Sequence, residues 1–278
     1  MELTVNQLAE RRLSDFFHKA EGSGPEALFA DPAAVAAAVA DGSDPRLYSA
    51  ARDALAPRVT KPGRGGRLGQ GFGATLWSAD LVTYEGGTLP GGEPFRSTGH
   101  WNPADQLEIF QVFSGRVLML TSVLDESGDQ SYVSYQECGA GELAVVPFGA
   151  WHLTYVLDGP AMVFNIYSGP ADVAGGGTGT DAAAYSTFSK YRSHRGPAEV
   201  TATRSGTGFD IALSAKWREA CGDPIEVSCP TWLDAHMPPS GLLTDLHVSG
   251  SDADLDALLA LGGTLSDARP TPTTVLAR

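Results

Sequence analysis

Short strand-like segments follow one another through the middle of the chain, and this succession constrains the fold more than any other feature. Turn-forming residues separate the segments, and no helical pattern intervenes, which excludes a parallel sheet built from strand–helix–strand units. The pattern predicts a mainly β protein with an antiparallel barrel or sandwich. The apolar or alternating runs occupy residues 75–84, 108–113, 116–123, 131–137, 142–147, 152–157 and 161–167.

The chain before this region carries helix-like patterns. Residues 3–20 place apolar side chains at a helical rhythm, and residues 44–56 form a further helical segment. Between them, Asp31 predicts the N-cap of an alanine-rich helix over 32–40, with proline at the first helical position. We therefore predict a helical N-terminal extension over residues 1–60, which would cover one end of the barrel or contact a second subunit.

The remaining boundaries follow from composition. Residues 61–73 are rich in glycine and basic residues and predict a flexible linker. A phosphate-binding P-loop is excluded, because no strand precedes the segment and no Gly-Lys-Ser/Thr follows it. The barrel is predicted over residues 74–207, with a last strand pair on either side of a turn at 195–197. A small α/β extension over 208–278 contains an amphipathic helix at 252–261.

Charge and cysteine content narrow the class of partner. The net charge is −14, so a phosphate backbone or an anionic membrane surface would be repelled. The 3 cysteines have no Cys-x-x-Cys spacing, which fits a reducing compartment better than a disulfide framework. No apolar run approaches the roughly 18 residues of a membrane helix. We expect a cytoplasmic protein that binds a small molecule and neither nucleic acid nor membrane.

Two segments carry the residues that suggest chemistry. In GELAVVPFGAWHLTYV (141–156) a buried strand ends at a tight turn, and the next strand opens with His152. In GHWNPADQLEIFQVFSG (99–115), Glu108 shares one strand face with apolar residues, where a carboxylate is costly unless it is paired or bound to metal. His100 precedes it. Two imidazoles and one carboxylate suit Fe²⁺, Mn²⁺, Ni²⁺ or Zn²⁺. The alternatives are a structural histidine, a solvent-facing carboxylate and an exposed turn.

These segments resemble the motifs of the cupin superfamily. The spacing Gly-x5-Pro-x-Gly-x2-His, from Gly141 to His152, is similar to the second cupin motif, and Glu-x6-Gly, from Glu108 to Gly115, to the end of the first. The resemblance implies a double-stranded β-helix, or jelly-roll barrel, with a divalent metal ion, most readily Fe²⁺. It also implies a homodimer paired through barrel edges.

Residues 80–204 resemble more narrowly the cupin-type glucose-6-phosphate isomerases. The similar runs are PGGEPFRSTGHWNP, VPFGAWHLTYVLDGPAMVFNIY and FSKYRSHRGPAEV. This resemblance implies a sugar phosphate substrate, with Glu108 and Tyr185 as candidate catalytic residues. The sequence departs from that family where Asn102 replaces the second histidine and Phe110 replaces a tyrosine. Asn102 is therefore either a weak or water-mediated metal ligand or a turn residue.

Several neighbouring residues are candidates for substrate binding. Arg96 and nearby hydroxyl groups suit a phosphate headgroup, although surface solvation explains them equally well. The aromatic residues around the predicted ligands would line the pocket or fill the barrel. The complete predicted set is Arg96, Ser97, Thr98, Gly99, Trp101, Phe110 and Tyr155.

Three functions are compatible with this sequence. The first is a metal-dependent aldose–ketose isomerase, in which the metal stabilises an enediol-like transition state. The second is a two-His-one-carboxylate Fe²⁺ oxygenase or lyase of specialised metabolism, since the predicted set lacks a further histidine. The third is a non-catalytic metabolite-binding cupin. Fold alone does not decide between them.

Overall fold

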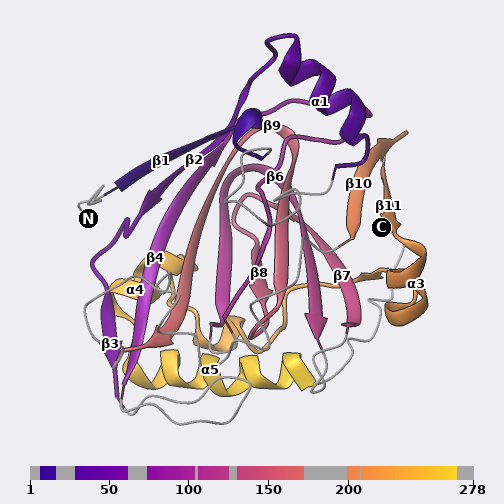
Figure 1. Ribbon diagram of the computed structural model, residues 1–278. Helices are drawn as coiled ribbons and strands as arrows, with labels where there is room; N and C mark the ends of the chain where they lie inside the picture. Colours follow the sequence, from indigo (N-terminus) through magenta and orange to yellow (C-terminus); the bar gives the residue numbers. More distant parts are fainter. Residues whose placement is uncertain are drawn as a thin grey trace.

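A large, mostly antiparallel β-sheet forms the body of the protein (Figure 1). The computed structural model describes residues 7–16, 29–61, 74–103, 106–124, 130–171, 199–206 and 208–267. The strands of the 10-stranded sheet are β1 (Gln7–Arg12), β2 (Arg46–Arg52), β3 (Arg58–Thr60), β4 (Thr75–Tyr84), β5 (His100–Trp101), β6 (Glu108–Leu124), β7 (Gln130–Gly139), β8 (Leu143–Val146), β9 (Trp151–Pro170) and β12 (Ile225–Glu226). A separate hairpin consists of β10 (Val200–Ser205) and β11 (Gly208–Leu213).

Helices lie around this sheet. In Figure 1, α5 runs across one end of the long strands, α1 lies at the opposite end, and α3 lies beside the β10–β11 hairpin. The helices among the described residues are α1 (Pro32–Ala40), α3 (Ala215–Cys221), α4 (Leu243–Ser249) and α5 (Asp252–Asp267), with short 3-10 turns at Leu13–Phe16 and Asp234–His236. In the described residues no helix combines the length and the hydropathy that crossing a membrane requires.

The two longest strands, β6 and β9, form an antiparallel ribbon that folds back on itself. Glu108 at the start of β6 is opposite Tyr167 of β9, which is fifteen positions from His152. A straight strand would separate those positions by roughly 50 Å. Yet Glu108 Oε2 lies 3.6 Å from His152 Nε2. The ribbon therefore curls over, which confirms the predicted mainly β jelly-roll architecture.

The fold-back point is visible in the strand register. The β6–β9 pairing shifts between Val112 and Val117, and Gly115 there has a φ of +76°. Bulges of this kind bend a strand and increase its twist. A Cβ atom at Gly115 would lie 2.6 Å from Pro160 O, so a glycine is needed for the two strands to approach this closely.

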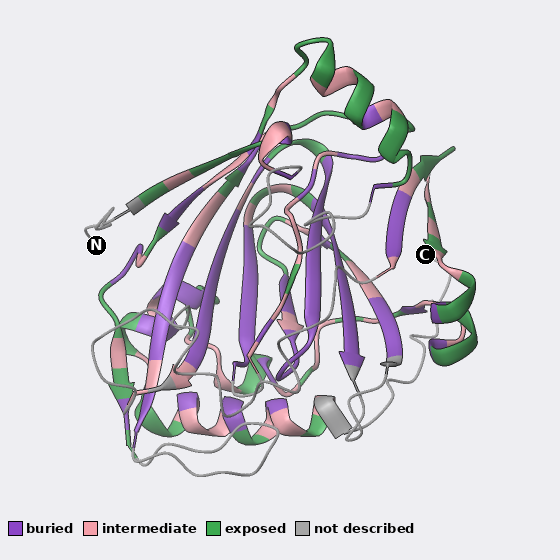
Figure 2. Ribbon diagram, viewed as in Figure 1, coloured by how far each residue is buried: buried purple, intermediate pink, exposed green. Residues whose placement is uncertain are grey.

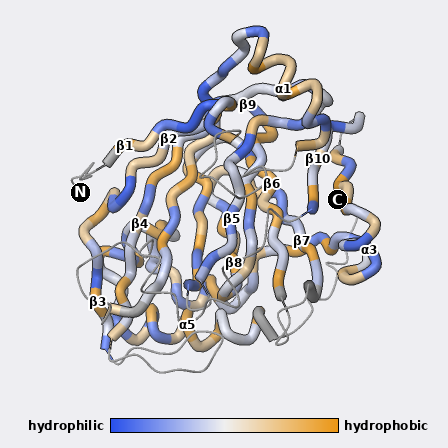
Figure 3. The backbone as a smooth tube through the Cα atoms, in the orientation of Figure 1, coloured by the Kyte–Doolittle hydropathy of each residue, from blue (hydrophilic) through white to orange (hydrophobic). Residues whose placement is uncertain are grey.

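The curled ribbon buries apolar side chains on both of its faces (Figures 2 and 3). Phe110 and Val112 of β6 point into the barrel, whereas Ile109, which precedes Phe110, points outward, as expected for alternating strand residues. Leucines of α4 and α5 cover one outer face, and Trp217 of α3 packs with residues of the β10–β11 hairpin on another. The described residues thus form an interior core, two cores on outer faces, and a fourth apolar cluster that includes Leu13, Phe16 and Val35.

The helix predictions have mixed outcomes. The helix over 32–40 is confirmed, with Ala34 N donating to the N-cap Asp31 Oδ1 at 3.0 Å, and so is the helix at 252–261. The helices predicted over 3–20 and 44–56 are wrong, because β1 and β2 occupy parts of both ranges.

Strand pairing explains these two errors. Strand β2 pairs with β1 on one edge and with β4 on the other, so its backbone groups find partners outside any helix. Leu47 and Ala51 are both buried, and their spacing of four positions imitates a helical face.

Some predictions lie outside the described residues. The linker at 61–73 does so apart from Lys61, as do the turn at 195–197 and the first strand of its hairpin. Strand β10, predicted as the second strand of that hairpin, pairs with β11. The division into extension, linker, barrel and tail stays a prediction.

Candidate metal centre

Three side chains from three different strands converge inside the barrel. His100 lies on β5, Glu108 begins β6, and His152 is the second residue of β9. One ligand atom from each side chain lies within 4.8 Å of the other two. Glu108 and His152 are buried, and His100 is exposed over part of its surface. The three residues that the sequence singles out thus lie close together, and their role as metal ligands stays a prediction.

Local pairing explains why the two histidines are neighbours. His100 and His152 are directly opposite one another in the β5–β9 pairing, and their ring centroids are 4.4 Å apart. Residues directly opposite on adjacent strands project to the same face of a sheet. The Phe110 ring closes a further side, with its centroid 5.5 Å from that of His152.

The β8–β9 turn brings His152 to Glu108. Val146 at the end of β8 is opposite Glu108. The chain then turns through Pro147–Ala150, where Gly149 has a φ of +65° and Ala150 N donates to Pro147 O at 3.2 Å. β9 begins immediately afterwards, so His152 lies only six positions beyond the residue that pairs with Glu108.

Amide groups hold the Glu108 carboxylate. Asn102 Nδ2 donates to Glu108 Oε2 at 3.0 Å, and Asn165 Nδ2 donates to Glu108 Oε1. Gln106 Nε2 donates to Asn102 Oδ1 at 3.1 Å and lies 3.5 Å from Glu108 Oε2. Both carboxylate oxygens are therefore oriented, and the Asn102 amide is engaged at both ends.

The electrostatic environment favours a bound cation. Burial lowers the pKa of His152 to about 3, with the positive charge of Arg52 acting in the same direction. Desolvation and the neighbouring His152 lower the pKa of His100. Burial raises the pKa of Glu108, against the opposing effect of its hydrogen bonds. Neutral imidazoles keep lone pairs available, and a cation would offset the cost of burying the carboxylate.

These residues fit a divalent metal ion. Atoms that share one ion through bonds of about 2 Å are at most about 4 Å apart, so small side-chain rotations would bring all three onto one centre. His152 Nδ1 is buried without a hydrogen-bond partner among the described residues. A buried unpartnered ring nitrogen is the kind of group that metal coordination satisfies.

The other predicted residues are distributed around the cluster. Ser97 is tied to β9, where its Oγ accepts from Thr154 N at 3.1 Å, and Thr98 Oγ1 lies 3.4 Å from the Tyr48 hydroxyl. Trp101 packs near Trp217, with ring centroids 6.5 Å apart. A Cβ at Gly99 would lie 2.7 Å from the Trp151 ring. Tyr185 lies outside the described residues.

Arg96 and Tyr155 belong to a separate buried cluster. Arg96 Nη1 donates to Glu93 Oε1 at 2.6 Å and to the Tyr155 hydroxyl at 3.3 Å. Arg96 and Glu93 are 1% and 0% exposed, so this is a fully buried ion pair. The substrate-binding role predicted for Arg96 and Tyr155 stays a prediction, and these contacts speak against it.

The sequence interpretation missed four polar residues around the cluster. Asn165 and Gln106 hold Glu108, and Arg52 forms an ion pair with the buried Asp80. A sequence signal exists for Asn165, a lone amide inside the apolar strand AMVFNIY. No comparable signal exists for Arg52, because it lies in a segment predicted to be helical.

Comparison with known proteins identifies partial structural matches. No family model and no curated protein matches the sequence. An oxalate oxidase in complex with glycolate has 22% identity and a TM-score of 0.27, covering 33% of this chain and 41% of its own. DMSP lyase DddQ from Ruegeria pomeroyi has 21% identity and a TM-score of 0.26, with coverages of 35% and 41%.

A third solved structure is similar to a comparable extent. Oxalate decarboxylase from Lactobacillus farciminis has 16% identity and a TM-score of 0.27, covering 40% of this chain and 30% of its own. The chain thus spans less than half of each of these proteins. At such TM-scores the matches carry no inference about activity, and the functional argument depends on this chain's own residues.

Proposed function

We propose that this protein is a metal-dependent enzyme of the cupin class that binds one divalent ion through His100, Glu108 and His152. The observation that carries the proposal is the convergence of these three side chains within 4.8 Å. The cupin-like spacing from Gly141 to His152 supports it, because the tight turn in that motif is the one that delivers His152. Fe²⁺ is the preferred ion, with Mn²⁺, Ni²⁺ and Zn²⁺ as alternatives.

The residues around the proposed metal site have different roles. When bound, the ion would supply Lewis-acid polarisation of a substrate oxygen. Asn102 and Asn165 orient Glu108 by donating to its two oxygens, a supporting role that fits Asn102 better than direct ligation. The Phe110 ring shields His152 from water on one side, and the exposed side beside His100 is left for substrate.

Among reaction classes, an oxygenase or lyase is better supported than an isomerase. An isomerase needs a mobile proton carrier, and both oxygens of Glu108 are held by amide donors. It also needs a phosphate-binding group, and Arg96 is committed to a buried ion pair. A two-His-one-carboxylate set leaves coordination positions free for substrate, which oxygenases and lyases use.

Metal analysis of alanine variants tests the centre itself. We expect stoichiometric metal in the wild-type protein and its loss in His100→Ala, Glu108→Ala and His152→Ala, measured by elemental analysis after expression with added Fe²⁺. His236→Ala is the matched control, since His236 pairs with Asp254 in the tail. Retention of metal in all three variants would remove the site.

Turnover experiments test the reaction class. The Fe²⁺-loaded protein is incubated with a panel of small hydroxy, keto and thio acids, with oxygen uptake and product masses recorded. Oxygen-dependent turnover indicates an oxygenase, and turnover under strict anaerobiosis indicates a lyase. Interconversion of glucose and fructose phosphates would instead restore the isomerase hypothesis.

We also propose that the chain forms a homodimer through a sheet edge. Strand β1 is the terminal strand of the sheet, and Leu8 on it is 60% exposed. Exposed strand edges tend to pair with other chains. Analytical ultracentrifugation of the wild type and of Leu8→Lys tests this, because the variant should shift toward monomer.

A further inference from the structure

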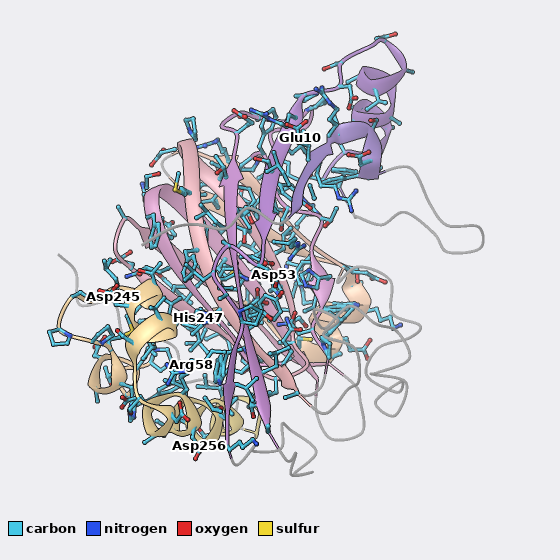
Figure 4. All side chains as sticks on the ribbon, turned by 90° about the vertical axis from the view of Figure 1, so that its left-hand side faces the viewer. Glu10, Asp53, Arg58, Asp245, His247 and Asp256 are labelled. Atoms are coloured by element: carbon cyan, nitrogen blue, oxygen red, sulfur yellow. The ribbon has the colours of Figure 1, made fainter. Side chains whose placement is uncertain are left out.

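A partly exposed arginine ends strand β2 on the side of the barrel that carries the metal cluster. The Arg52 side chain is 49% exposed, and its Nη1 is ion-paired with Asp80, whose side chain is fully buried. Asp53 N donates to the other oxygen of Asp80 at 3.0 Å. Asp53 is a non-glycine residue with a φ of +49°, and Figure 4 shows it near the centre of the face turned toward the viewer. Asp80 thus fixes where the guanidinium lies.

A row of paired residues connects Arg52 to the metal cluster. Ala51 of β2 is opposite Leu81 of β4, which aligns Arg52 with Asp80. Asp80 is in turn opposite Asn165 of β9, and Asn165 donates to Glu108. Because opposite residues share a sheet face, Arg52 belongs to the inward face on which Glu108 lies.

The charge of Arg52 reaches all three candidate ligands. It lowers the pKa of His100, His152 and Glu108, although burial is the largest influence on each of these groups. Only Nη1 of Arg52 has a hydrogen-bond partner in the part of the chain that the structure describes. The remaining N–H groups of its planar fork are therefore free to bind carboxylate or phosphate oxygens.

We propose that Arg52 is a specificity-determining residue that binds an anionic group of the substrate while the metal ion binds another part of the same molecule. The substrate class is a small molecule with a carboxylate or phosphate group close to a metal-binding oxygen. This inference rests on the proposed metal centre. It gives Arg52 the part that sequence analysis predicted for Arg96, which is buried in its own ion pair.

Anion binding to the Co²⁺-loaded protein tests the inference. The visible absorption of Co²⁺ is titrated with malonate, phosphonoacetate and malonamide, which differ in charge and in their anionic groups. We expect both anions to perturb the spectrum and the neutral diamide to leave it unchanged. Arg52→Gln should raise the Kd for the anions at least tenfold, and Arg52→Lys by less, because the lysine keeps the charge.

Arg46→Gln provides a matched control. Arg46 lies on the same strand, is 44% exposed, and is also ion-paired, with Glu10 and Glu85. It should leave the Kd for malonate unchanged. Tighter binding of phosphonoacetate than malonate would assign the anion to the phosphate class, and the reverse order to the carboxylate class. Either order supports the inference.

Two failures are distinguishable. If the wild-type protein binds no Co²⁺ stoichiometrically, the proposed metal centre is wrong and this inference is lost with it. If Co²⁺ binds, but the anions do not or Arg52→Gln binds them as tightly as the wild type, the metal centre stands and the role of Arg52 is refuted. Metal content measured on every variant separates the two cases.

Discussion

Replacing Arg96 by methionine would test whether this residue stabilises the fold or binds substrate. The guanidinium is 1% exposed, is ion-paired with Glu93, and lies over the rings of Phe29 and Tyr155 at 5.3 and 5.4 Å. Glu93 Oε2 also accepts from Ala30 N at 3.1 Å, so the cluster joins the N-terminal segment to the barrel. Methionine keeps an unbranched apolar stem of similar flexibility and removes the guanidinium with its charge.

The expected loss of stability is large. Removing one partner of a buried ion pair leaves an uncompensated buried charge and typically costs about 3–5 kcal/mol. Because globular proteins are stable by about 5–15 kcal/mol, Arg96→Met should still fold at 25 °C. Adding Glu93→Gln removes the stranded charge while keeping an acceptor, so the double variant should recover roughly half of the loss.

Urea unfolding followed by tryptophan fluorescence measures these differences at pH 7. Arg116→Met is the control, since Arg116 is 50% exposed and bridges Glu137 and Asp158 at the surface. Such exposed pairs contribute about 0–1 kcal/mol. A loss for Arg96→Met no larger than that of the control would refute the structural role and return Arg96 to the candidates for substrate binding.

Three further outcomes are expected. Asn165→Ala should weaken metal binding about 10- to 100-fold without abolishing it, measured by competition with a chelator, because Glu108 loses one orienting donor. Gly115→Ala should lose more stability in urea than Gly141→Ala. Both glycines have positive φ, which costs about 1–2 kcal/mol for alanine, but only the Gly115 Cβ meets backbone atoms. His247→Gln should flatten the loss of stability on acidification. Burial lowers the pKa of His247, so the wild-type protein loses stability as pH falls through the unfolded value of about 6.5, whereas glutamine does not titrate.

Local patterns predicted the barrel because its strands alternate with turn residues over short distances. The same reasoning was wrong at the N-terminus for a physical reason. Strand β2 has its hydrogen-bonding partners in β1 and β4, and the pairing with β4 joins residues thirty or more positions apart. Spacing within the segment cannot report such partners, and an alanine-rich strand with buried Leu47 and Ala51 looks helical.

The candidate site also contains residues that local sequence patterns predict and residues that they do not. His152 and Glu108 could be predicted because turns adjacent to them have characteristic spacings. Arg52 could not, because its relation to Glu108 passes through Asp80 and Asn165 on two further strands. The charge of Arg96 and its position near His100 in the sequence predict a substrate-binding residue, whereas in the fold Arg96 forms an ion pair with the buried Glu93.

Residues of the C-terminal extension (208–278), here called the tail, cover an outer face of the β6–β9 ribbon. Gln111 of β6 points away from the interior and is 1% exposed. Its side chain donates to Gly241 O and accepts from Leu243 N, both at 2.8 Å. Leu255, Leu258 and Leu259 of α5 complete the apolar cover. Without the tail, a buried amide and an apolar sheet face would meet water. We therefore infer that the tail stabilises the curled ribbon, and with it the convergence of the three metal-binding side chains.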